Sequence, residues 1–518
     1  MRGWTSMVDT RKRRVAVFLF FLLAFGVMLV FFGETGKPSC MTVPVLTEEE
    51  QADLGEYVQR DLSRELQYNS QRAAVDCRTS TIYIAQDIRK DTKMEDLTGS
   101  LGSFTPSLRL SFAPDPAFHD LAAAVEQGHV FKLNVSHGYK KYMQYDMVFT
   151  TLPVLRLEGE GIGETEKGKE IVAGTMCLWT PWDPDVNSHS VKTSNAQWHI
   201  RGGYSATLQK TPFKLNLKNK TGTGKSISLA GLGADDDWIL NPMNLDDTKL
   251  KEKLFMQLWN RRARQVDWNE KMSEGEYVEV VINQEYCGLY QLQRRIDRKF
   301  LNLKSGDVLL KSGADLVAPD AETAYEIIHS GLTREQTYAL VQDFFDEKDP
   351  ELLNMDNFLD VNLFLQWASA VDNMIKNMFF VMKEGTSGYQ MSLLPWDTDM
   401  SWGTVWKAEI NGFGYDFEMS RQNTALRIEY EWMQKYYPDL DQQMAGRWKE
   451  LRETLLTMEN ISGVLEQEQQ ILDSSGVLPR DAVRWGLYYK GEDSKENLYR
   501  SIEARLAWVD EYYSQYLQ

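Results

Sequence analysis

The chain has 518 residues, of which 43% are hydrophobic and 12% aromatic, and its formal net charge is −18. This length allows two or three domains, and the apolar content excludes a largely disordered chain. The acidic balance argues against nucleic acid as a partner and against binding to an anionic surface. The four cysteines form no Cys-x-x-Cys pair and the six histidines form no H-E-x-x-H motif, so nothing indicates a zinc site.

The N-terminus has the composition of a membrane anchor. The basic cluster Arg11–Arg14 precedes an uncharged apolar run, residues 15–32, which would span roughly 30 Å as a helix. Positive charge before the run and Glu34 after it place the N-terminus in the cytoplasm. We expect a cytoplasmic tail at 1–14, a single-pass transmembrane anchor at 15–32 and an extracytoplasmic bulk. A cleaved signal peptide is the alternative, but no A-x-A-like site follows Phe32.

Residues 33–144 are predicted to form a stalk and a small β-rich region. The segment Glu48–Gln67 is polar and favours a helix, which would form the stalk. Short strands are predicted at Thr81–Ile84 and Val130–Val135, and a third at Leu152–Leu157 leads into the next region.

The main domain is predicted to cover residues 145–518 and to begin with β structure. In two segments apolar and polar residues alternate as in strands, and two later segments form a hairpin. A helix is predicted between the first two strands and the hairpin. The strands are Gln197–Arg201, Phe213–Leu217, Tyr277–Ile282 and Cys287–Leu292, and the helix is Asp246–Trp259.

From residue 335 onward the pattern is mainly helical. The predicted helices are Arg334–Phe345, Met355–Val371, Asp439–Met458 and Glu496–Gln518. The predicted fold class is therefore α+β, with a β-rich N-lobe followed by a helical C-lobe, an order that resembles kinase-like architecture. The predicted anchor and the small β-rich region precede these two lobes. This architectural likeness is an analogy and does not establish activity.

Two polar motifs flank a predicted hairpin within the helical part. Asp372-Asn373 and Lys376-Asn377 precede the strand Met378–Met382, and Pro395-Trp396-Asp397-Thr398-Asp399 follows the strand Gly388–Leu394. Such a hairpin would bring Asp397 and Asp399 just beyond a strand end, near an Asp and an Asn. Carboxylate and amide oxygens with a possible base are what Mg²⁺-assisted phosphoryl transfer requires.

Two other motifs resemble functional sequences but are interpreted as loops. Gly222–Ser226 ends like a P-loop, but the position of its leading glycine is occupied by Asn219, so a hairpin turn is predicted. Pro181–Asp185 imitates the later motif, but its second proline breaks any strand.

Five segments, in order, resemble the CotH family, the spore-coat-protein-H kinases with an atypical protein-kinase-like fold. Each segment alone is weak, and together they cover roughly residues 145–500. They are Arg201-Gly202-Gly203 with Lys210–Leu215; Asp237–Asn241 followed by Leu250–Leu258; Tyr277–Tyr290; Asp372 to Asn377; and Pro395–Gly403.

The resemblance implies phosphorylation that uses ATP with Mg²⁺ or Mn²⁺, and it suggests roles for particular residues. The nucleotide would be bound by Lys214, Arg201 and Glu252. Lys214 would be catalytic because it would contact the nucleotide phosphates. Glu252 could also pair with Lys214, as a helix glutamate does in ordinary kinases. An exposed strand lysine is the structural alternative for Lys214.

The remaining implied roles concern the base and the metal. Asp372 would be the catalytic base or would orient the acceptor hydroxyl, while Asn377, Asp397 and Asp399 would hold the metal. Two neighbouring carboxylates are costly unless a cation or protons neutralise them. The structural alternatives are a polar turn after a helix for Asp372 and Asn377, and an Asx-turn for the two aspartates.

The chain also departs from the family pattern at two places. Gln293-Arg294-Arg295-Ile296 stands where L-x-E-K-I is common, and Lys251-Glu252 stands where Arg-Asn is common. Both changes bear on nucleotide affinity.

The favoured function is a membrane-anchored, extracytoplasmic CotH-like kinase that phosphorylates hydroxyls of proteins at the cell surface or spore coat. The main alternative is a non-catalytic kinase-like scaffold of the cell envelope or spore coat. A glycan-binding or glycan-modifying protein is a third possibility, suggested by 15 tryptophans, although abundant tryptophan more often fills a core.

Overall fold

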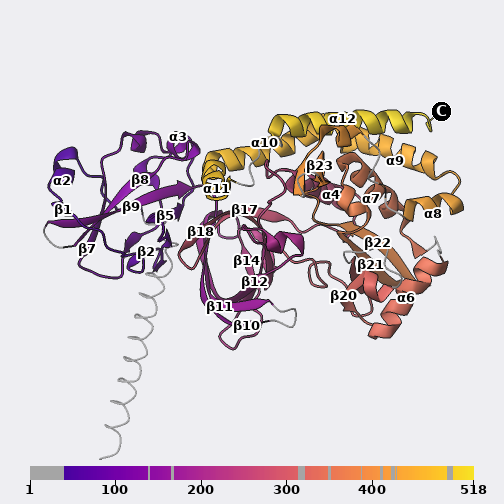
Figure 1. Cartoon of the computed structure of the whole chain (residues 1–518), viewed down its shortest axis with the longest axis horizontal. Helices are drawn as coiled ribbons and strands as arrows, with labels where there is room; N and C mark the ends of the chain where they lie inside the picture. Colours follow the sequence, from indigo (N-terminus) through magenta and orange to yellow (C-terminus); the bar gives the residue numbers. More distant parts are fainter. Residues whose placement is uncertain are drawn as a thin grey trace, which may run out of the picture.

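The computed structural model describes residues 40–137, 140–164, 169–312, 321–347, 352–386, 388–408, 412–421, 426, 429–486 and 494–517 (Figure 1). The predicted anchor, residues 15–32, lies outside these ranges, as does the predicted cytoplasmic tail. Among the helices that are described, none has the length and apolar character needed to cross a membrane.

The first part of the described chain is a mixed sheet with the strand order β4-β5-β9-β8-β7 and with β1 beside β9. The strands predicted around residues 81 and 131 are β5 and β8. The element bounds are α2 Glu48–Ala52, β1 Glu56–Tyr57, β2 Leu66–Tyr68, β3 Gln71–Arg72, β4 Ala74–Asp76, β5 Thr81–Ala85, β6 Leu101–Ser103, β7 Leu108–Phe112, α3 Leu121–Glu126, β8 Phe131–His137 and β9 Lys141–Thr150.

The predicted stalk helix is wrong beyond Ala52. Gly55 adopts a φ of +92°, and a Cβ there would lie 2.5 Å from backbone atoms of Lys140. The chain then pairs Glu56–Tyr57 in parallel with β9. Strand pairing with distant residues therefore overrides a local preference for helix, which contributes little by itself.

The second part is a closed β-barrel with the strand order β10-β11-β12-β13-β16-β18-β17. Parallel pairing of β10 with β17 closes it. Leu215, Trp238 and Leu292 point into its core, because alternate residues of a strand face the same side. The bounds are β10 Val154–Glu164, β11 Glu170–Asp183, β12 Ser188–Ile200, β13 Phe213–Lys218, β14 Ile227–Leu229, β15 Leu232–Asp235, β16 Asp237–Asn241, β17 Gly275–Ile282 and β18 Glu285–Arg294.

The third part combines helices with a sheet of order β20-β19-β21-β22. The chain is thus α+β, as predicted, with a β-rich lobe before a largely helical one (Figure 1). The bounds are α4 Lys251–Gln265, β19 Val308–Ser312, α5 Ala321–Ala324, β20 Tyr325–Ser330, α6 Arg334–Glu347, α7 Met355–Ala368, β21 Met378–Gly385, β22 Gly388–Pro395, β23 Thr404–Lys407, β24 Gly412–Tyr415, α8 Glu429–Tyr436, α9 Leu440–Thr454, α10 Met458–Ser475, α11 Val477–Trp485 and α12 Lys495–Ser514.

Three predicted helices end earlier than expected, and the one predicted at Glu496–Gln518 ends at Ser514. The helix predicted to reach Val371 ends at Ala368, because Ser369 adopts a left-handed φ of +48°. The helix predicted at Asp439–Met458 is two helices, since α9 ends at Thr454 and Thr457 caps the start of α10.

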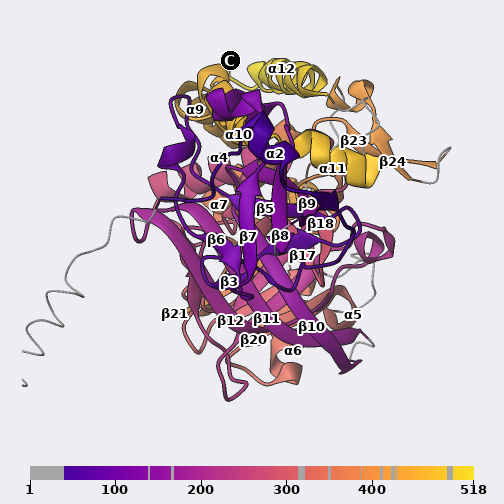
Figure 2. The ribbon, with the colours of Figure 1, turned by 90° about the vertical axis from the view of Figure 1, so that its left-hand side faces the viewer.

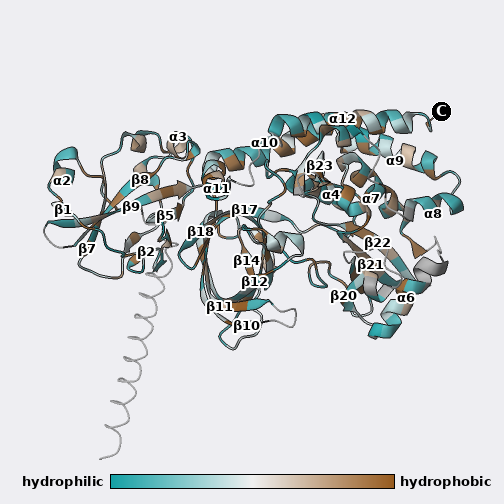
Figure 3. Cartoon of the chain, in the orientation of Figure 1, coloured by the Kyte–Doolittle hydropathy of each residue, from teal (hydrophilic) through white to brown (hydrophobic). Residues whose placement is uncertain are grey.

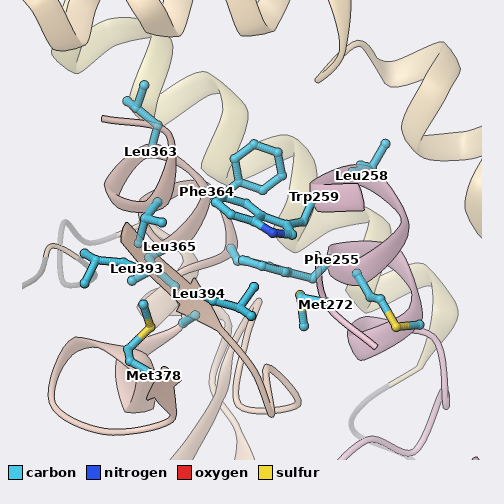
Figure 4. Close-up of a cluster of buried hydrophobic side chains, with 14 of the residues drawn as sticks. Phe255, Leu258, Trp259, Met272, Leu363, Phe364, Leu365, Met378, Leu393 and Leu394 are labelled. Atoms are coloured by element: carbon cyan, nitrogen blue, oxygen red, sulfur yellow. The ribbon is translucent and has the colours of Figure 1, made fainter. Parts of the chain in front are cut away.

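Helix α4 follows barrel strands in the sequence but packs into the core of the helical lobe. Phe255 and Trp259 of α4 lie edge-to-face against Phe364 of α7, with ring centroids 5.7 and 5.2 Å apart (Figure 4). Figure 3 shows teal and brown alternating along α12, as expected for a helix with one face on this core. Helix α4 therefore connects barrel strand β16 to the core of the helical lobe.

The N-terminal sheet packs against the outside of the barrel (Figure 2). Tyr83 of β5 stacks on Tyr286 of β18 with ring centroids 4.3 Å apart. The Tyr286 hydroxyl donates to Glu279, which also pairs with Arg480 of α11 at 2.6 Å. The three parts therefore meet at one buried network, and the predicted boundary at residue 145 falls inside β9.

A buried ion pair joins α11 to the segment that precedes barrel strand β13. It leads to a prediction about stability. Lys210 and Asp481 are 1% and 0% exposed and lie 2.9 Å apart. We expect Asp481→Ala to lower the free energy of unfolding by about 3–5 kcal/mol, because it leaves a buried ammonium unpaired. Denaturant unfolding would measure this. Asp473→Ala, on the exposed face of α10, is the control and should change it by less than about 0.5 kcal/mol. A loss below about 1 kcal/mol for Asp481→Ala would contradict the prediction.

Candidate functional site

The two predicted polar motifs meet at one end of the β21–β22 hairpin. Met378 is paired with Pro395 in the register, so the residues just outside this pair are neighbours. The backbone N–H of Trp396 donates to the carbonyl of Asn377 at 3.1 Å. The predicted hairpin is confirmed, and Asp397 and Asp399 follow the end of β22 as expected.

Asparagine side chains fasten the two motifs together. Nδ2 of Asn377 donates to Oδ2 of Asp372 at 2.9 Å and to the carbonyl of Asp397 at 3.4 Å. Nδ2 of buried Asn373 donates to the carbonyls of Asn377 and Trp396 at 3.0 and 2.9 Å. Asn377 and Asp397 both have a φ of +56°, a left-handed conformation that Asn and Asp tolerate better than other side chains. The Asp372 carboxylate is thus fixed beside the Asp397 loop.

Three carboxyl groups from two segments lie close enough to repel one another. Burial, then the charges of Asp397 and Glu252, raise the pKa of Asp399 well above its ordinary value. Burial also raises the pKa of Asp397, against the lowering effect of Arg201. Burial and the Asp397 charge raise the pKa of Glu252 to about 8. Such a group favours a bound cation, which would relieve the repulsion.

These shifts predict how stability depends on pH. The native pKa of Glu252, about 8, exceeds its ordinary value of 4.5, so between these values the folded chain binds more protons than the unfolded chain. The melting temperature of the metal-free protein should therefore fall as pH rises through this range, and less steeply in Glu252→Gln. The exposed control Glu503→Gln should keep the parent slope. Equal slopes in all three proteins would contradict the assignment.

Two cations lie over the ring of Trp396 and act on the charge of Asp397. Arg201 follows the end of β12, and Lys311 lies on β19; their charged groups are 5.7 and 4.0 Å from the ring centroid. Burial lowers the pKa of Arg201, and burial with the Arg201 charge lowers the pKa of Lys311 to about 8. Sequence reasoning missed Lys311, although a lysine within the apolar run 308–312 was an available signal.

Lys214 has a different partner from the one suggested. Its Nζ lies 3.4 Å from Asp237, which also pairs with Arg295 at 3.3 Å. Glu252 instead accepts hydrogen bonds from Asn241 at 2.7 Å and Gln293 at 3.2 Å. The suggested pair of Lys214 with Glu252 is therefore wrong, because Asp237 of the adjacent strand satisfies the lysine.

The structure thus brings together Arg201, Glu252, Asp372, Asn377, Asp397 and Asp399, and adds Lys311. In the described part of the chain, no three His, Cys, Asp or Glu residues are arranged to hold a metal ion by themselves. Mg²⁺ is usually bound by one or two carboxylates together with substrate phosphates rather than by an all-protein cage. Two repelling carboxylates with an amide beside them fit a metal that arrives with a nucleotide.

Comparison with known protein families assigns the chain to one of them. A search of the curated proteins finds no match. The model of the CotH kinase protein family matches residues 198–509, which is more than half of the chain and includes every residue of the site described above. The chain therefore belongs to the CotH kinase protein family.

Proposed function

We propose that this protein transfers a phosphoryl group from ATP, bound with Mg²⁺ or Mn²⁺, to a hydroxyl of a protein at the cell surface or spore coat. The observation that carries the proposal is the convergence of carboxylates and cations from five separate segments on the end of the β21–β22 hairpin. Family membership supports kinase chemistry in general. The acceptor and the activity itself are part of the proposal.

Asp372 is proposed as the group that accepts the proton of the acceptor hydroxyl. Its two carboxylate oxygens are oriented by Asn377 and by Lys376, whose Nζ lies 3.1 Å from Oδ1. A carboxylate fixed in this way loses little freedom when it orients a hydroxyl for attack. Lys376 also balances negative charge as phosphate approaches.

Arg201 and Lys311 are proposed to bind the phosphate oxygens, while Asp397, Asp399 and Asn377 hold the metal. A divalent ion at this position would neutralise charge on the transferring phosphoryl group. The two cations lie close to the Trp396 ring and are partly desolvated, which strengthens their attraction for phosphate.

The proposal includes attachment to a membrane through residues 15–32, with the catalytic part outside the cytoplasm. Its support is the sequence pattern of a basic cluster, an apolar run and an acidic remainder. A protease-accessibility experiment on intact cells would test this orientation, because an extracytoplasmic bulk would be cleaved without lysis.

The central experiment measures transfer of labelled phosphate from ATP by the full chain in detergent. It uses Mg²⁺ or Mn²⁺, with dephosphorylated casein and the protein itself as acceptors. Transfer that Asp372→Ala and Asp397→Ala both abolish would support the kinase and the assigned roles. A folded protein with neither transfer nor metal-dependent ATP binding would favour the non-catalytic scaffold instead.

A further inference from the structure

Helix α4 begins with two charged residues that the fold buries. Lys251 is 0% exposed and Glu252 is 8% exposed. Lysine and glutamate are rarely buried to this extent unless a partner compensates the lost hydration. The first turn of a helix also carries the positive end of its dipole, so an ammonium group there is unfavourable. A lysine at this position therefore requires specific compensation.

The contacts of Lys251 lead to residues 397–404, the proposed metal-binding loop. Its Nζ donates to Oγ1 of Thr404 at 2.6 Å and lies 6.0 Å from the ring centroid of Tyr415. Its backbone N–H donates to Oδ2 of Asp246 at 2.8 Å, which fixes the start of the helix. Thr404 is itself buried and begins β23, only five residues after Asp399.

The segment from Asp397 to Thr404 is a short turn with internal hydrogen bonds. Oγ of Ser401 donates to the carbonyl of Thr398 at 2.7 Å, and the backbone N–H of Thr404 donates to the carbonyl of Ser401 at 3.1 Å. The backbone N–H of Trp402 donates to the end of α7 at Ala368, at 2.7 Å. These hydrogen bonds connect Thr404 through Ser401 to Thr398, which lies between the two aspartates in the sequence.

The neighbouring Glu252 connects the same helical turn to the barrel. It accepts hydrogen bonds from Asn241 of β16 and Gln293 of β18. The first turn of α4 therefore contacts the barrel through one side chain and the metal-binding loop through the other.

We propose that Lys251 is a positioning residue: through Thr404 it holds the 397–404 segment so that Asp397 and Asp399 face a single divalent cation. The inference rests on the proposed function, because the cation is the one that accompanies the nucleotide. It adds a residue that touches neither nucleotide nor acceptor but sets the geometry of the metal ligands.

The same helix offers a matched control. Lys253 is 4% exposed and pairs with Glu468 at 3.2 Å, and its Nζ donates to the carbonyl of Gly275 at 2.6 Å. Its contacts lie on β17 and α10, away from the metal-binding loop. Replacing it by methionine removes a buried ammonium from α4 just as Lys251→Met does, but leaves the bond to Thr404 intact.

The test measures Mn²⁺ binding by the full chain in detergent, in the presence of a non-hydrolysable ATP analogue. Electron paramagnetic resonance of the free Mn²⁺ ion gives the amount that is bound. Lys251→Met should weaken Mn²⁺ binding by about tenfold or more, as loss of an outer-shell partner typically does. Thr404→Val should act in the same direction, and the double variant should be no weaker than the worse single variant. Lys251→Arg should restore part of the affinity, and Lys253→Met should leave it within about twofold of the parent.

Two results would overturn the inference. One is an Mn²⁺ affinity of Lys251→Met within twofold of the parent, and the other is an equal loss in Lys253→Met. Failure of the parent itself to bind Mn²⁺ with the nucleotide analogue is a separate result, which would contradict the proposed function instead. Circular dichroism of each variant would show that it folds.

Discussion

The Asp399→Asn protein is expected to lose phosphoryl transfer by about 10³-fold or more and yet to melt at a higher temperature than the parent in metal-free buffer. The loss follows because a metal that neutralises the phosphates contributes several kcal/mol to the transition state, and each 1.36 kcal/mol is tenfold in rate. The gain in stability follows because burial, Asp397 and Glu252 all disfavour the Asp399 charge. The asparagine keeps the shape but carries no charge.

Paired measurements would separate these two effects. Transfer from labelled ATP gives the first, and melting with and without Mg²⁺ plus ATP gives the second. The parent should gain melting temperature from the metal and nucleotide, whereas Asp399→Asn should gain little. Asp416→Asn serves as the control, because Asp416 accepts a hydrogen bond from the backbone of Glu418 and lies outside the site. Transfer by Asp399→Asn within tenfold of the parent would contradict the metal role.

Local patterns in the sequence predicted the elements that carry the site. The alternation at 277–292 predicted the β17–β18 hairpin, and the apolar run after Asn377 predicted β21. The position of Asp397 just past the end of β22 followed from the predicted β21–β22 hairpin alone. These features depend on residues close together in the chain, for which side-chain periodicity is sufficient.

The features that could not be predicted depend on residues far apart in the chain. Closure of the barrel needs β10 to pair with β17, more than a hundred residues later. The charge of Lys311 acts on Asp397 because β19 pairs with β21, and Lys214 lies beside Asp237 because β13 pairs with β16. No local pattern specifies such partners, and so the cations of the site were only partly identified.

The sharpest test of the cation assignment compares Lys311→Met with Lys214→Met. Lys311→Met should lower kcat/KM for ATP by about 10²-fold, equivalent to about 2.7 kcal/mol, because it removes a partly desolvated charge near Asp397. Lys214→Met should lower it by less than about fivefold, since Asp237 keeps Arg295 as a partner. Initial rates over a range of ATP concentrations at saturating Mg²⁺ would measure both.

The reverse order of effects would show that Lys214 contacts the phosphates, as the family resemblance implies, and that its pairing with Asp237 is exchanged for phosphate when nucleotide binds. Equal and small effects would leave Arg201 as the cation that matters, and Arg201→Met would then be expected to show the full loss. Each result assigns the phosphate contact to a particular strand: β19 for Lys311, β13 for Lys214, or the end of β12 for Arg201. The comparison therefore determines which strand of this member of the CotH kinase protein family carries the proposed phosphate-binding cation.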